Sequence, residues 1–265
     1  MIEVFIFLLT GVLTGIAAGL FGLGGGLIIV PVITYSLISF SNIPLDQAIL
    51  YGISTSLASM VITGAMATYA HTINKNVDYK IIHKFVIGII FGALLIGYII
   101  NIFPGKILKY FFIIYTFFIA YRIYSHKANF IINNSLITNN FVSNLVGFIF
   151  SIISGLVGIG GATLFVPFLI GHKIPAKLAI GTSSALGFLI GLGASISIFI
   201  NSLYFEPINN YMFGFVYLPA ILFLTLPSLF FVKLSANWLL KISDANVKKL
   251  FSSMLLIIGF LMLFN

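Results

Sequence analysis

Apolar runs of roughly membrane-spanning length fill almost the whole chain, and only short polar segments separate them. A transmembrane helix needs about 20 predominantly apolar residues, and runs of about that length lie at 2–20, 47–71, 81–100, 106–124, 141–158, 178–200, 211–232 and 248–264. Hydrophobic residues make up 60% of the 265 residues and charged residues 7%, against roughly 45–50% and 25% in a soluble domain. The sequence therefore predicts an all-α polytopic membrane protein without a water-soluble domain.

Two further apolar runs, 27–40 and 162–170, are too short to cross a bilayer as helices, and each follows a glycine cluster. A helix of about 14 residues extends about 21 Å, whereas the hydrocarbon core is about 30 Å thick. We therefore expect each short run to pair with the long run before it. The pair forms either two full crossings or a re-entrant hairpin, and both return the chain to the side on which the pair began.

The basic residues decide between two topologies, because cytoplasmic loops carry an excess of Lys and Arg. If each pair returns to its starting side, 11 of the 13 basic residues fall on one face and only Lys106 and Lys109 on the other. If the short runs dip in without crossing, the division is 8 against 5. The first arrangement fits the rule better and places both termini outside. The first run has Glu3 and no preceding Lys or Arg, unlike a signal peptide, so we expect it to be retained.

An internal repeat relates the two halves of the chain. Residues 19–31 match residues 155–167 without a gap, and the Thr-Ser pair at 55–56 recurs at 182–183. Each half holds five membrane segments, an odd number, so the second half must be inserted upside down. This is the inverted-repeat architecture of secondary transporters, whose substrate sites lie at the repeat interface. We predict two five-helix halves, 1–124 and 141–265, joined by a linker loop at 125–140, with short or broken helices after the Gly-rich turns.

The duplicated block resembles a family of membrane transporters. The pattern Gly-x-Gly-Gly-(Gly/Ala), the Val-Pro that follows it, and the Thr-Ser pair on the next helix of each half resemble the TauE/SafE sulfite exporter (TSUP) family over nearly the whole chain. The resemblance implies transport of small anions, with sulfite and organosulfonates as the named substrates, across the bacterial cytoplasmic (inner) membrane. The second half departs from the pattern at Ala162, and Ile198 stands where a counterpart of His71 would lie.

Candidate ligands for an anion are backbone N–H groups and hydroxyls, because no Lys or Arg lies in the middle of any predicted span. A buried cation in a membrane is costly, whereas a helix N-terminus offers unpaired N–H groups and about half a positive charge. The two short helices would present their N-termini to one oxyanion from opposite faces. The predicted substrate-binding residues are Gly22, Gly24, Gly25, Gly26, Thr55, Ser56, Gly158, Gly160, Gly161, Thr182 and Ser183.

Structural roles for the same residues stay open at this point. Glycines in membrane helices allow close packing, and Ser or Thr in an apolar helix commonly bonds to a carbonyl one turn earlier. Pro31 and Pro167 are candidates for gating but would also kink or stiffen the short helices. His71 is either an interfacial histidine or a proton-sensitive gate.

The sequence thus predicts a transporter that moves small anions by alternating access, and not an enzyme. An anion channel is the nearest alternative. An intramembrane serine protease is a weaker one, because no histidine is placed as a base for a buried serine. With no cysteine and scattered histidines, neither a metal site nor a cofactor is expected. The expected partners are the anion, the lipid bilayer and a second copy in a homodimer, but no nucleic acid.

Overall fold

The computed structural model describes residues 2–124, 139–205 and 211–264, and within them it is built from helices. The helices are α1 Ile2–Phe21, α2 Gly26–Ser41, α3 Leu45–Ile73, α4 Tyr79–Ile99, α5 Gly105–Tyr124, α7 Asn140–Val157, α8 Ala162–Gly171, α9 Ala176–Ser202, α10 Leu218–Leu239 and α11 Asp244–Phe264. Six of them, α1, α3, α4, α7, α9 and α10, are long and apolar enough to cross a membrane. The predicted all-α polytopic class is confirmed.

The boundaries predicted for one span are wrong at both ends. Residues expected at the start of the run 211–232 form an antiparallel hairpin of β1 Met212–Phe213 and β2 Val216–Tyr217, and α10 follows it. Gly214, with φ +58°, makes the hairpin turn. A proline in the first turn favours the start of α10, since its missing N–H has no helical partner there. The helix continues past residue 232 to Leu239, and the Lys233 side chain within it is exposed.

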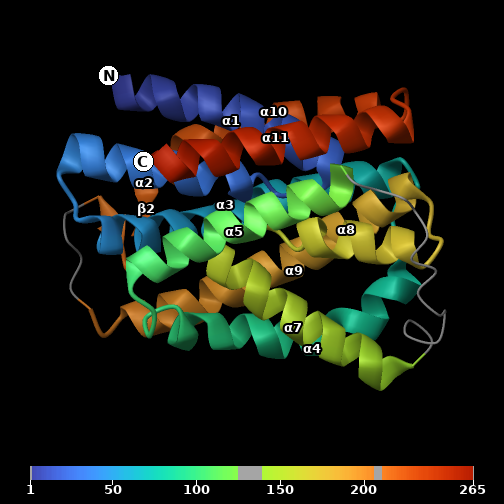
Figure 1. Cartoon of the computed structure of the whole chain (residues 1–265), viewed down its shortest axis with the longest axis horizontal. Helices are drawn as coiled ribbons and strands as arrows, with labels where there is room; N and C mark the ends of the chain where they lie inside the picture. The colour runs from blue at the N-terminus through green and yellow to red at the C-terminus, as the bar shows by residue number, and fades with distance from the viewer. Residues whose placement is uncertain (1, 125–138, 206–210, 265) are drawn as a thin grey trace.

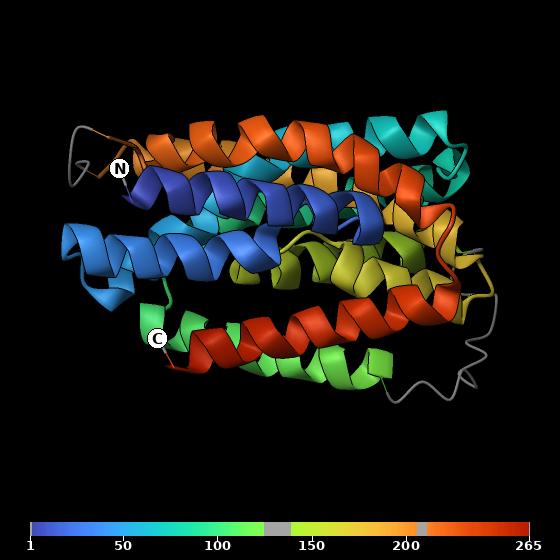
Figure 2. The same ribbon diagram turned by 90° about the horizontal axis from the view of Figure 1, so that it is seen from above.

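The two glycine clusters interrupt the bundle in its middle (Figure 1). α1 runs inward from the end that holds both termini, and α2 returns to that end, whereas α7 and α8 do the same from the opposite end (Figures 1 and 2). This is the out-and-back course predicted for each long-and-short pair. We call the end with both termini the terminal end and the opposite end the lysine-rich end.

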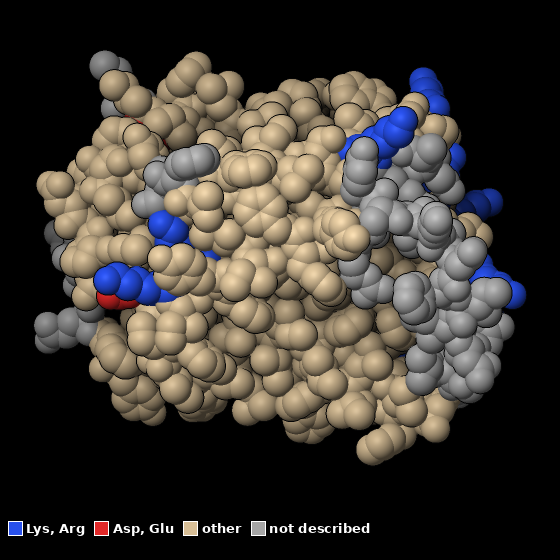
Figure 3. All heavy atoms as spheres, in the orientation of Figure 1, with Lys and Arg blue, Asp and Glu red and all other residues tan. Residues whose placement is uncertain are grey.

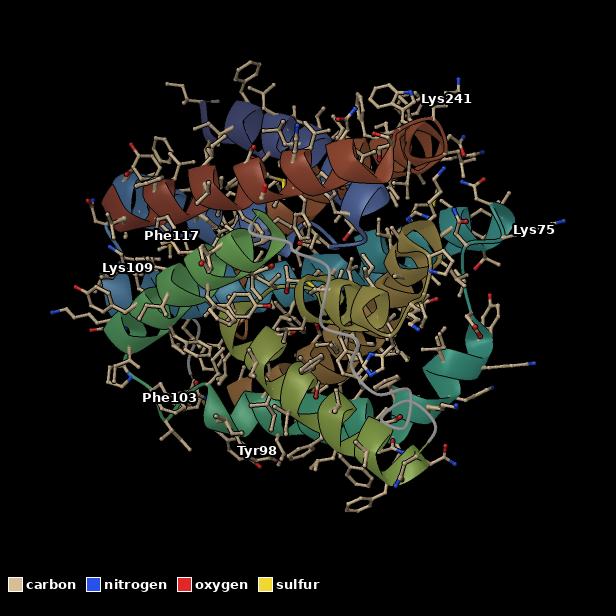
Figure 4. The ribbon with its side chains drawn as sticks, turned by 45° about the vertical axis from the view of Figure 1, so that its right-hand side comes forward. Lys75, Tyr98, Phe103, Lys109, Phe117 and Lys241 are labelled. Carbon is tan, nitrogen blue, oxygen red and sulfur yellow. The ribbon has the colours of Figure 1, made fainter. Side chains whose placement is uncertain are left out.

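The charges lie at these two ends. Lys75 and Lys241 project from the lysine-rich end, and Lys109 lies at the terminal end (Figure 4). In the space-filling view the charged atoms gather at both ends and the broad middle is uncharged (Figure 3). Lys127, one of the residues predicted on the basic face, and most of the predicted linker lie outside the described residues.

Each half packs its first helix against the fourth helix of the other half. Gly11 on α1 approaches the carbonyl of Leu224 on α10, and Gly147 on α7 approaches the carbonyl of Phe85 on α4. A Cβ at Gly147 would lie 2.8 Å from that oxygen, so neither contact admits a side chain. The same contact therefore occurs twice between corresponding helices, and the two halves interlock. The half boundaries themselves stay a prediction.

Candidate functional site

Two glycine turns precede the short helices and adopt conformations that other residues rarely take. In the first turn Gly22, Gly24 and Gly25 have φ values of +71°, +63° and +86°. In the second turn Gly158 has φ +70°, whereas Gly161 has φ −54° and directly precedes α8. Left-handed φ is strained for residues with a Cβ, so the glycines are required to reverse the chain within four residues at each place.

The two turns lie directly against each other. A Cβ on Gly26 would overlap the carbonyl oxygen of Gly158 and lie 3.0 Å from the Cα of Ile159, and a Cβ on Gly160 would overlap the carbonyl oxygen of Leu23. All of these residues are buried. The structure therefore brings the two predicted glycine clusters together at the interface of the halves, packed too closely to hold a solute in this conformation.

Both short helices point their N-termini at this contact. In α2 the N–H groups of Ile28 and Ile29 bond to the Gly25 carbonyl, and in α8 those of Leu164 and Phe165 bond to the Gly161 carbonyl. Within the described chain no acceptor is bonded to the N–H groups of the first residues, Gly26, Leu27, Gly161 and Ala162. Two such ends together supply roughly one positive charge, and they do so where no charged side chain is present.

Of the two predicted serines, Ser56 contacts the turns directly. Ser56 Oγ donates to the Gly158 carbonyl at 2.7 Å and so links the first half to the second turn. Ser183 is buried, and its Oγ has no hydrogen-bond partner among the described residues. Thr63, which the sequence did not single out, donates to the Gly24 carbonyl at 2.7 Å. It lies two helical turns after Ser56 on α3, a spacing that could have indicated a shared face.

The predicted threonines are hydrogen-bonded across the two halves. Thr55 Oγ1 on α3 accepts a bond of 3.0 Å from the N–H of Tyr217, the residue before α10. Thr182 Oγ1 on α9 accepts one of 3.0 Å from the N–H of Asp78, the residue before α4. Both threonines are fully buried. Each one therefore holds the segment that covers one end of the bundle, the hairpin at the terminal end or the α3–α4 loop at the lysine-rich end.

The three gating candidates occupy different surroundings. Pro31 lies inside α2 and Pro167 inside α8, and both remove a helical hydrogen bond there. His71 lies on α3 with its side chain fully buried, and neither ring nitrogen has a hydrogen-bond partner among the described residues. None of the three belongs to the contact between the turns.

A cavity of about 340 Å³ opens at the terminal end between α3, the loop that joins α4 to α5, the start of α5 and the hairpin. Its polar lining residues are Asp46, Gln47, Tyr51 and Asn101, and the ring of Phe215 packs edge-on against Tyr51. Thr55 lies one helical turn further along α3 from Tyr51.

The described residues offer little for catalysis or metal binding. They contain no group of three His, Cys, Asp or Glu side chains that could hold a metal ion. The hydroxyls of Ser54 and Ser183 and both nitrogens of His71 are all unpaired within the described chain, so no serine is bonded to this histidine. A nucleophile activated by an adjacent base is not formed by these residues.

Comparisons with known proteins agree on one family. The family model for the sulfite exporter TauE/SafE matches residues 7–262. A probable membrane transporter protein of Haemophilus influenzae is 30% identical over 253 residues, covering 95% of each chain. One of Methanocaldococcus jannaschii is 30% identical over 97% of this chain and 94% of its own length. No solved structure matches significantly. On the strength of the match over nearly the full chain, this protein belongs to the TauE/SafE sulfite exporter family.

Proposed function

We propose that this protein is a membrane transporter of small anions, with sulfite or an organosulfonate as its substrate. The observation that carries the proposal is the meeting of two oppositely directed helix N-termini with unpaired N–H groups in a buried site without charged side chains. Such ends bind oxyanions without the cost of a buried lysine or arginine. The match to the sulfite exporter family and the similarity to probable membrane transporter proteins support the same function.

A small oxyanion suits this site better than a large apolar solute does. The candidate ligands are the N–H groups of the two turns, the Ser56 hydroxyl, which would have to leave the Gly158 carbonyl, and the buried, unpaired hydroxyl of Ser183 on α9. These groups donate hydrogen bonds, as sulfite and sulfonate oxygens require. The turns must separate to admit the anion, because they touch in the conformation described.

Alternating access between the halves provides that separation. Thr55 holds the hairpin at the terminal end and Thr182 holds the α3–α4 loop at the lysine-rich end. In this proposal the conformation with both bonds formed is the state closed on both sides. Release of one bond at a time would open the site to one side of the membrane while the other stays sealed.

The lysine-rich end faces the cytoplasm in this proposal, by the positive-inside rule, and both termini face outwards. With the inside negative, moving one negative charge outwards gains about 2.3 kcal/mol per 100 mV, and a dianion gains twice that. Export of an anion therefore needs no further energy source.

Flux into proteoliposomes of purified protein tests the proposal. We expect saturable flux of sulfite or an organosulfonate such as sulfoacetate, and competition between the anions that share the site. Sulfate, thiosulfate and carboxylates serve as comparison anions. Flux that does not saturate would favour a channel, and no flux of any tested anion would reject the proposal.

A further inference from the structure

The His71 side chain is a polar group for which packing gives no reason. It is fully buried on α3, two residues before the helix ends, and neither Nδ1 nor Nε2 is bonded to any described residue. Buried polar groups are nearly always hydrogen-bonded, and an exception in a native structure calls for an explanation. Ionisable residues inside membrane segments are functional by default.

The other half of the chain shows that the position does not need a histidine. Ile198 on α9 corresponds to His71 on α3, at the same offset of 127 residues that relates Thr182 to Thr55. The Ile198 side chain is also buried, with 1% of its surface exposed. An apolar side chain therefore satisfies the packing at this place in the fold, and the imidazole must be explained by its chemistry.

Burial disfavours the charged form of the His71 ring in the conformation described, and one neighbouring helix end offsets part of this cost. The carbonyl of Gly19, near the C-terminal end of α1, faces the ring but lies outside hydrogen-bonding geometry here. The C-terminal end of a helix carries a partial negative charge that favours His⁺. Gly19 precedes the first glycine turn by three residues along the chain.

No other charge occupies this position. From α10, Ser235 packs against Gly19, and its hydroxyl bonds to the carbonyls of Gly15 and Val232. In the α3–α4 loop, the amide side chain of Asn74 bonds to Asn237 on α10, and Asn76 packs against Gly181 on α9; neither amide titrates. The charged side chain of α10, Lys233, is exposed.

The proposed site also lacks one positive charge for a divalent substrate. Two helix N-termini supply roughly one elementary charge between them, and neither turn carries a basic side chain. A divalent oxyanion would keep about one negative charge uncompensated in a low-dielectric site, where attraction to a nearby cation is strong. A proton on His71 would supply that charge only while the anion is bound.

We propose that His71 is a proton-binding site, and that its proton crosses the membrane together with the anion. A ring nitrogen takes the proton from water on the side where the anion enters and donates a hydrogen bond to the Gly19 carbonyl. The proton returns to water on the side where the anion leaves, so no covalent bond other than N–H changes. The inference rests on the proposed function, and it adds the coupled ion.

Proton movement measured beside anion flux tests this inference. Proteoliposomes containing a pH-sensitive dye are given a gradient of thiosulfate, which stays divalent and unprotonated near neutral pH, or of sulfite. In wild type we expect protons to move in the same direction as the anion, at about one proton per divalent anion. The two test variants are His71→Gln and His71→Ile, the second of which copies the counterpart residue of the second half. In both variants we expect the remaining thiosulfate flux to carry no protons. The remaining sulfite flux should carry fewer protons per anion than in wild type.

His83→Gln is the matched control, because His83 is an exposed histidine on the neighbouring helix α4, and it should keep the wild-type coupling. Anion flux without proton movement in wild type, proton movement opposite to the anion, or full coupling in both His71 variants would overturn the inference while leaving the transport proposal standing. No flux of either anion in wild type would instead contradict the transport proposal, so the two failures are distinguishable.

Discussion

The hydroxyl oxygen of Thr182 on α9 accepts a 3.0 Å hydrogen bond from the N–H of Asp78, the residue that caps α4. Thr55 on α3 makes the same contact with Tyr217 before α10, again at 3.0 Å. In each case a threonine of one half holds the start of the fourth helix of the other half. The hairpin and the α3–α4 loop lie at opposite ends of the bundle (Figure 1), so under the proposed alternating access each threonine would hold a different gate.

Replacing either threonine should open the gate that it holds. Thr55→Val keeps the shape but leaves the buried N–H of Tyr217 unpaired, which costs about 1–3 kcal/mol, or about 5- to 150-fold in a two-state equilibrium. Thr182→Val should have a smaller effect, because the N–H of Asp78 is only part-buried. Thr55→Val should therefore favour the state open at the terminal end, and Thr182→Val the state open at the lysine-rich end. The chain has no cysteine, so Ser54→Cys or Ser183→Cys introduces a single thiol. The rate at which a thiol reagent added on either side of the membrane labels this thiol reports opening to that side.

Thr68→Val is the control for these variants, because Thr68 bonds only to the carbonyl of Gly64 within its own helix. It should leave both labelling rates at the values of the parent protein. Equal changes at both reporters in Thr55→Val and Thr182→Val would contradict separate gates and indicate a general loosening of the bundle.

Leucine at two different glycines should separate the site from the scaffold. Gly160→Leu places a side chain where the turns meet, and overpacking costs about 1–3 kcal/mol. We expect flux to fall about tenfold or more in the protein that remains folded, together with a lower unfolding temperature. Gly147→Leu disrupts the α4–α7 pair instead and should also lower the unfolding temperature, while the folded protein keeps most of its flux. Wild-type flux in folded Gly160→Leu would exclude the turns as the site.

The two serines should respond differently to alanine. Ser56→Ala removes its bond to the Gly158 carbonyl and should cost about 1 kcal/mol of stability. Ser183 has no partner to lose within the described chain, so Ser183→Ala should weaken anion binding without lowering stability. Thermal unfolding with and without sulfite measures both effects. Unchanged sulfite affinity in Ser183→Ala would remove this hydroxyl from the binding site, and Ser59→Ala, which loses only a bond within α3, is the control.

Labelling of intact cells should establish the orientation of the chain. Lys109 lies at the terminal end and Lys75 at the lysine-rich end (Figure 4). Lys109→Cys should react with a membrane-impermeant thiol reagent added outside, as should a cysteine placed at either terminus, whereas Lys75→Cys should be protected until the cells are opened. The reverse pattern would invert the proposed topology and with it the assignment of the inner gate.

Local and periodic features of the sequence determined the membrane class, most helix positions and the out-and-back course of each long-and-short pair. Apolar runs and the side on which lysines lie do not depend on distant contacts, because the bilayer sets helix length and loop charge sets sidedness. The run assigned to α10 was wrong at its ends: the hairpin before it forms by strand pairing, and the helix continues beyond Lys233 to Leu239.

Only the tertiary structure decided which groups each candidate residue meets. The repeat indicated that Thr55 and Thr182 correspond, but their bonds to Tyr217 and Asp78 join residues more than 100 positions apart, and no local pattern encodes such a distance. The tertiary structure likewise decided the contact between Gly26 and Gly158. It also decided that the His71 ring has no hydrogen-bond partner among the described residues, because an unpaired buried group is defined by all the residues packed around it.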